Sequence, residues 1–172
     1  MKETPDYEKY PVSDEEMGPR YKNWTDTLAR QLVIFYQVGK EVGGEKFVER
    51  LKEEFYKIGR KTAEGWLSMT QTSREEFRDC MALPKLQDFI DDRYANFWNG
   101  YVEHTPQAFE KELYTCPVTK PMSREPELCE ILVAESFKGM LATLNPKFKT
   151  VGFTELLPKG HRCCRLRVTL ED

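Results

Sequence analysis

The chain has 172 residues and a formal net charge of −3 at pH 7, with 40% apolar and 32% charged residues. This length fits one globular domain, and the composition excludes a collagen-like, coiled-coil or wholly disordered chain. No apolar run approaches the roughly 20 residues of a membrane-spanning helix, and the first residues lack the apolar segment of a secretory signal. The slightly acidic balance, without a basic block, argues against non-specific nucleic-acid binding.

The five cysteines and two histidines carry most of the reactive chemistry. The odd number of cysteines and the absence of a secretory signal favour reduced thiols and a cytoplasmic location. Two histidines are too few for a histidine-rich metal site, whereas a site built from thiolates stays open.

The first 20 residues contain three prolines and few apolar residues, which predicts an extended N-terminal arm. A single domain is expected over residues 21–172. Apolar residues recur at helical spacing on both sides of Gly43-Gly44, which predicts two helices with a break between them. The first stripe consists of Leu28, Leu32, Phe35, Tyr36 and Val42, and the second of Phe47, Leu51, Phe55 and Ile58.

A further helical region is predicted over residues 73–98. Ser73 and Glu76 have the spacing of a capping box, in which each side chain binds the backbone of the other residue. Pro84 indicates a break, and a helical apolar stripe continues behind it.

The hydrophobic period changes after Trp98 from helical to strand-like. Residues 99–116 alternate around a turn at 105–107, which predicts two strands. A helix is expected from residue 125 to 144, between Pro126 and Asn145-Pro146, and two strands over residues 149–157 and 164–170. The order predicts an α+β fold, with N-terminal helices (21–98) followed by a ββαββ antiparallel sheet unit (99–172).

Candidate site residues gather at the ends of the C-terminal elements, where functional sites usually form. Cys116 ends a strand, and Cys164 begins the last strand on its core-facing side. Cys129 lies in the first turn of the helix, where the helix dipole favours a thiolate. Glu135 stands in an apolar stretch, where burial would raise its pKa and make it a usable acid or base.

Each of these residues also has a purely structural explanation. A cysteine in an apolar stretch is usually a small core residue. Glu135 fits an exposed helix edge equally well, and His161 fits a solvated loop. His104 is expected at the surface, near the turn between the two strands.

Four segments in order resemble the family of L-2-amino-thiazoline-4-carboxylic acid hydrolase-like proteins: TCP (115–117), ELCEILVAES (127–136), LNPKFK (144–149) and GHRCCRLRV (160–168). The resemblance implies a hydrolase that opens the C–N bond of a cyclic amidine in a small carboxylated substrate. Cys116, Cys129, Glu135 and Cys164 match the family pattern by position. The chain has Glu135 where the pattern has aspartate, and His161 where it has an acidic residue.

Opening a cyclic amidine needs a nucleophile and an acid that protonates the leaving group. The expected catalytic residues are Cys129 or Cys116 as nucleophile, Glu135 as acid–base group and His161 as proton shuttle. A substrate carboxylate would be bound by Lys147, Arg165 or Arg167. If a metal ion is present, the soft ligands Cys116, Cys129 and Cys164 suit zinc or iron.

Two other interpretations stay open. Helices followed by a ββαββ unit with cysteines at its seams also resemble 4-vinyl-reductase-like domains, which implies a non-catalytic sensor of a small molecule or metal. In the third interpretation, amphipathic helices with Phe and Tyr on their apolar stripes form a homodimer, and the thiols are inert.

Overall fold

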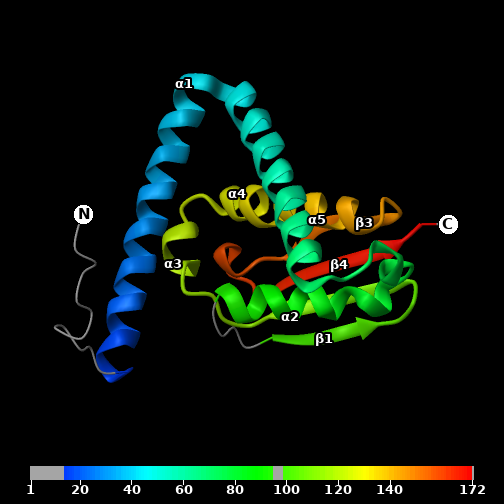
Figure 1. Cartoon of the computed structure of the whole chain (residues 1–172). Coiled ribbons are helices and arrows are strands. Elements are labelled where there is room, and N and C mark those ends of the chain that lie inside the picture. Colours follow the sequence, from blue (N-terminus) through cyan, green and yellow to red (C-terminus); the bar gives the residue numbers. More distant parts are fainter. Residues whose placement is uncertain (1–13, 95–98, 172) are drawn as a thin grey trace, which may run out of the picture.

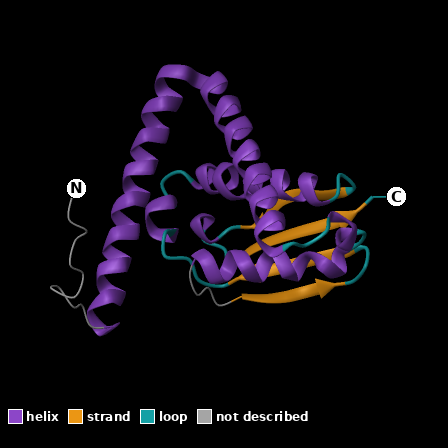
Figure 2. Ribbon diagram, viewed as in Figure 1, coloured by secondary structure: helices purple, strands orange, loops and turns teal. Residues whose placement is uncertain are grey.

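The computed structural model describes residues 14–94 and 99–171 and confirms the predicted α+β class. The helices are α1 (Asp14–Thr70), α2 (Leu83–Tyr94), α3 (Thr119–Met122), α4 (Pro126–Cys129) and α5 (Ser136–Leu144). The strands are β1 (Asn99–His104), β2 (Ala108–Leu113), β3 (Phe148–Glu155) and β4 (Cys164–Leu170). The strands form an antiparallel sheet in the order β1-β2-β4-β3. Helices lie against one face of this sheet (Figure 2).

Helix α1 consists of two arms that meet at a sharp bend (Figure 1). The bend lies at Gly44, whose backbone has φ 56° and ψ −144°, a conformation that favours glycine. The predicted break at Gly43-Gly44 is therefore confirmed. We call residues 14–43 the first arm and residues 45–70 the second arm. Residues 14–20, which we expected to be extended, are helical, and residues 1–13 lie outside the described part.

The first arm is fastened to the body by side-chain hydrogen bonds to the start of α4. The Tyr36 hydroxyl donates to Glu127 at 2.6 Å, and the Lys40 ammonium group donates to the same carboxylate oxygen at 2.9 Å. Gln37 donates to Glu125 at 3.0 Å. Beneath these bonds a hydrophobic cluster joins both arms to the segments around α3 and α4; its buried members are Ala29, Val33, Tyr36, Val48, Met122, Leu128, Cys129, Ile131, Leu156 and Cys164.

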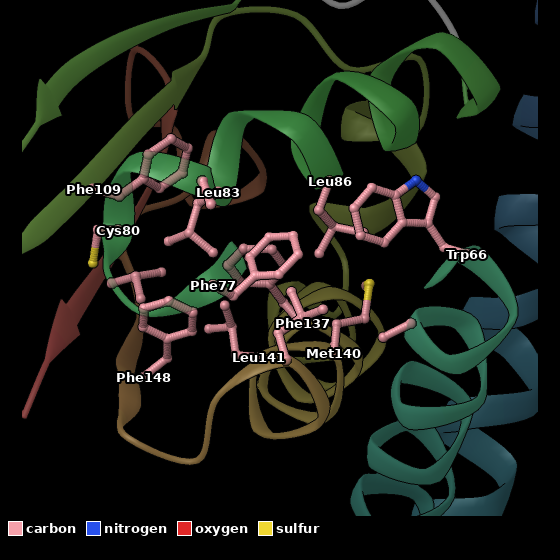
Figure 3. Close-up of a cluster of buried hydrophobic side chains, with 14 of the residues drawn as sticks. Trp66, Phe77, Cys80, Leu83, Leu86, Phe109, Phe137, Met140, Leu141 and Phe148 are labelled. Atoms are coloured by element: carbon pink, nitrogen blue, oxygen red, sulfur yellow. The ribbon is translucent and has the colours of Figure 1, made fainter. Parts of the chain in front are cut away.

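The largest hydrophobic cluster fills the space between the second arm, α2, α5 and the sheet (Figure 3). Phe77 lies in its middle and is fully buried, with its ring 5.7 Å from that of Trp66. It belongs to a 3₁₀ turn, Arg74–Phe77, which is held by the predicted capping box of Ser73 and Glu76. The capping-box prediction is confirmed, although the element that it caps is shorter than expected.

The strand predictions also agree with the structure. The turn between β1 and β2 is closed by a hydrogen bond from the Thr105 amide to the Ala108 carbonyl at 2.8 Å. The core-facing side of β4 carries the buried residues Cys164, Leu166 and Val168, as its alternation predicts. The predicted helix over residues 125–144 contains α4 and α5, joined by a π-helical segment, Glu130–Glu135, that the sequence does not reveal.

Candidate functional site

Three of the five thiols converge from separate elements. Cys116 follows β2, Cys129 is the last residue of α4, and Cys164 is the first residue of β4. Cys116 and Cys164 lie near enough to Cys129 to raise its pKa. Cys163 directly precedes β4, and its thiol donates a hydrogen bond to Glu155 at 3.4 Å. Cys80 belongs to the cluster around Phe77.

Burial keeps these thiols protonated. Burial is the largest cause that raises the pKa of Cys129 to about 12, and of Cys164 and Cys80 to about 11 each. Burial also raises the pKa of Cys116. Hydrogen bonds to its sulfur from backbone amides and from the Thr119 side chain lower this pKa, but burial has the larger effect. At Cys129 the loss of hydration thus outweighs the helix dipole on which our expectation of a thiolate rested.

A native thiol titration at pH 8 is expected to show one accessible cysteine, Cys116, because the other four are buried. Its rate of reaction with a disulfide reagent should increase further from pH 8 to pH 9, because the raised pKa of Cys116 leaves little thiolate at lower pH. The measurement is the release of the coloured leaving thiol with time, with Cys116→Ser as the control that removes the first phase. Rapid reaction of two or more thiols near neutral pH would contradict this account.

The predicted acid–base residue Glu135 lies apart from the thiols. It ends the π-helical segment and forms an ion pair with Lys138 at 2.6 Å. It lines a shallow hollow of about 410 Å³ together with Glu49, Lys52, Glu53, Tyr56 and Lys57 of the second arm. None of the cysteines lines this hollow.

The remaining predicted site residues lie in exposed loops or in ion pairs with other residues of the chain. His161 is exposed, and its Nδ1 accepts a hydrogen bond from the Leu156 amide at 2.9 Å. Lys147 is an exposed residue beyond α5. Arg165 forms ion pairs with Glu110, Glu112 and Glu155, and Arg167 with Glu103 and Glu110. The two arginines therefore neutralise carboxylates of the protein itself.

The ion pairs of Glu112 predict acid sensitivity. Hydrogen bonds from Tyr114 and Arg165 lower the pKa of this nearly buried carboxyl. Its contribution to stability is therefore complete above the pKa of an unfolded glutamate, about 4.3, and is lost as the pH falls through the lower folded value. Glu112→Gln should be less stable than the wild type at pH 7, and the difference should shrink towards pH 3.

Urea unfolding at pH 7, 5 and 3 measures this difference, with Glu53→Gln as the control. Glu53 forms its ion pair with Arg50 at the surface, where both side chains are well exposed. Equal pH dependence of the two variants would show that the pairs of Glu112 do not stabilise the fold.

The described residues contain no group of three His, Cys, Asp or Glu side chains that could hold a metal ion. The prediction of a metal-binding protein is therefore wrong for the predicted ligand set of Cys116, Cys129 and Cys164. A zinc or iron ion held in another way stays a prediction, which elemental analysis of the purified protein tests. Within the same residues, no helix is sufficiently long and apolar to cross a membrane.

The first arm carries an exposed row of apolar side chains that overlaps the first apolar stripe predicted from the sequence. It follows the first arm at steps of three and four residues. We call it the arm stripe: Tyr21, Trp24, Leu28, Leu32, Phe35, Val38 and Val42. The exposed fractions run from 39% at Leu28 to 84% at Val42. The spacing was visible in the sequence, but it gave no sign that the stripe faces away from the core.

Comparison with solved structures gives an informative similarity. No family model matches the chain, and no curated protein matches it significantly. Among solved structures, it is similar to trafficking protein particle complex subunit 3 from Naegleria fowleri, which is covalently bound to palmitic acid in that structure. The TM-score is 0.60 at 11% sequence identity, over 88% of this chain and 97% of that chain. At this identity the similarity concerns the fold.

This comparison corrects the functional prediction. The similar structure is a subunit of a trafficking complex, not a thiazoline hydrolase. The family resemblance is therefore wrong, as are the hydrolase that it implied and the predicted small-molecule substrate. The geometry gives the physical reason: the carboxyl of Glu135 lies apart from the thiols, and burial holds those thiols in the protonated form.

Proposed function

We propose that this protein is a non-catalytic assembly subunit of a vesicle-trafficking particle, and that it works in the cytoplasm by binding other proteins. The fold similarity to a trafficking-particle subunit supports the class of assembly. The five free cysteines are in keeping with a reducing compartment.

The arm stripe is the observation that carries the proposal. An isolated exposed apolar residue is ordinary, but a continuous row of them on one helix marks a protein-binding surface. Tyr21, Trp24 and Phe35 supply the large aromatic contacts that protein interfaces favour. The opposite face of the same arm is already occupied, because Ala29, Val33 and Tyr36 are buried against the body.

The proposal is tested by recovering the tagged chain from cells of its source organism after mild chemical cross-linking. Mass spectrometry should identify subunits of a trafficking particle with the wild type, and these should be lost with Phe35→Glu. Met69→Glu is the matched control, because Met69 is a similarly exposed apolar residue on the second arm. The proposal fails if the wild type recovers no such subunits, or if Phe35→Glu recovers the same set.

A further inference from the structure

Cys116 and Cys129 lie at the two ends of a compactly wound connection. They are 13 residues apart in the sequence, and the chain between them makes a series of short turns. The Thr119 amide donates to the Cys116 carbonyl at 3.3 Å, and the Glu125 amide donates to the Met122 carbonyl at 3.1 Å. Because each turn changes the direction of the chain, the two cysteines stay near each other despite their separation in sequence.

The same hydrophobic cluster surrounds both positions. Cys129 and Cys164 are buried members of the cluster beneath the first arm. Leu113 and Val118, which stand on either side of Cys116 in the sequence, pack against that cluster. Leu113 is also the partner of Cys164 in the pairing of β2 with β4. The three thiols therefore lie in one region of the fold, contributed by three different elements.

The other cysteines are placed less favourably for a disulfide. Cys80 belongs to the largest hydrophobic cluster, and the Cys163 thiol donates to Glu155. Cys163 and Cys164 are adjacent, and adjacent Cα atoms are about 3.8 Å apart, closer than the Cα atoms of an ordinary disulfide. The Cys164 sulfur accepts a hydrogen bond from the Leu157 amide at 3.3 Å, which holds it beside that segment. These contacts leave Cys129 as the favoured partner of the thiol that follows β2.

Cys116 has the properties of the thiol that reacts first. It is partly accessible, whereas the other four cysteines of the chain, all within the described part, are buried. Its sulfur accepts hydrogen bonds from the amides of Val118 and Thr119 and from the Thr119 side chain, which favour the thiolate and oppose the effect of burial. A dissolved reagent therefore reaches Cys116 before it reaches Cys129.

We propose that Cys116 and Cys129 form a reversible disulfide when a low-molecular-weight disulfide oxidises the protein. In the first step the Cys116 thiolate attacks the reagent, forms a mixed disulfide and expels one reagent thiolate. In the second step the Cys129 thiol gives its proton to water, and its sulfur attacks that of Cys116 and expels the second reagent thiolate. The two protein thiols thus lose two electrons and two protons, and the reagent is reduced to two thiols.

The disulfide locks the segment that fastens the first arm. The bond encloses residues 117–128, which contain α3 and most of α4. Within this loop, Glu125 accepts the hydrogen bond of Gln37, and Glu127 accepts those of Tyr36 and Lys40. Closing the loop restricts the unfolded chain and keeps the segment from separating from the end of β2. Oxidation therefore stabilises the seat of the first arm, whether or not the arm stripe binds trafficking-particle subunits.

Reaction of the reduced protein with an aromatic disulfide reagent at pH 8 tests the bond. The wild type should release one coloured thiol and then, more slowly, a second, and should end about 2 Da lighter with no reagent attached. Cys129→Ser should release one thiol and retain the reagent on Cys116, while Cys164→Ser, the matched control, should behave as the wild type does. Peptide mapping without reduction should join Cys116 to Cys129. A wild type that retains the reagent, or a bond from Cys116 to Cys164, would overturn the inference.

Thermal unfolding of the purified oxidised form tests the lock. Its melting temperature should exceed that of the reduced wild type by roughly 5–10 °C, and dithiothreitol should remove the difference. Cys129→Ser treated in the same way should show no such rise. An oxidised wild type that melts at or below the temperature of the reduced protein would show that the bond strains the fold, and the lock would be wrong.

Discussion

Gly59→Ala is expected to lower the free energy of unfolding by about 3 kcal/mol or more. The second arm and α5 cross at this residue in near backbone contact. A Cβ atom on Gly59 would lie 1.8 Å from the carbonyl oxygen of Ser136, and one on Gly139 would lie 2.0 Å from that of Tyr56. Because the obstacles are backbone atoms, no side-chain rotation relieves the clash, and the two helices must move apart.

Gly65→Ala is the matched control for this substitution. Gly65 belongs to the same helix, and a Cβ atom there meets nothing within 4 Å. This variant should be more stable than the wild type by up to about 1 kcal/mol, because alanine has the higher helix propensity. Denaturant unfolding of both variants measures the difference. A Gly59→Ala variant within about 1 kcal/mol of the wild type would show that the crossing tolerates separation.

Local patterns allowed most of the secondary structure to be predicted. The bend at Gly44, the capping box of Ser73 and Glu76 and the turn after β1 depend on residues close together in the chain. The inward face of β4 follows from simple alternation. The crossing at Gly59 could not be predicted, because the glycine is required by Ser136, which lies 77 residues further along the chain.

The candidate site was harder to predict than the fold. Cys116 and Cys164 both raise the pKa of Cys129, so these thiols are neighbours, but they form no group that could hold a metal ion. Their association with Glu135 had no such basis: Cys129 and Glu135 are six residues apart, and in the α-helix that we expected, positions six apart differ by about 120° around the axis. A motif defined by that spacing therefore does not by itself place thiol and carboxyl on one face.

The arm stripe illustrates the remaining limit. The first arm has two apolar faces, one with Ala29, Val33 and Tyr36 and one with Leu28 and Phe35. The predicted stripe combined Tyr36 of the buried face with Leu28 and Phe35 of the exposed face, because the choice of the buried face depends on the surface that α3 and α4 present. A sequence pattern cannot distinguish a face that packs on the body of its own chain from a face available to a second chain.

Phe77→Ala and Phe35→Ala should distinguish an aromatic side chain that packs in the core from one that is exposed on the arm stripe. Phe77 is fully buried, so its truncation should lower the free energy of unfolding by about 3–5 kcal/mol through lost contacts and a new cavity. Phe35 is 71% exposed, so the same truncation there should change the free energy of unfolding by no more than about 0.5 kcal/mol.

The two variants must be compared where the chain is monomeric, because dimer formation would add its own concentration-dependent stability. Urea unfolding at the lowest measurable protein concentration provides this condition. Equal loss of monomer stability in both variants would mean that Phe35 packs within its own chain, and the arm stripe would then not be a free surface.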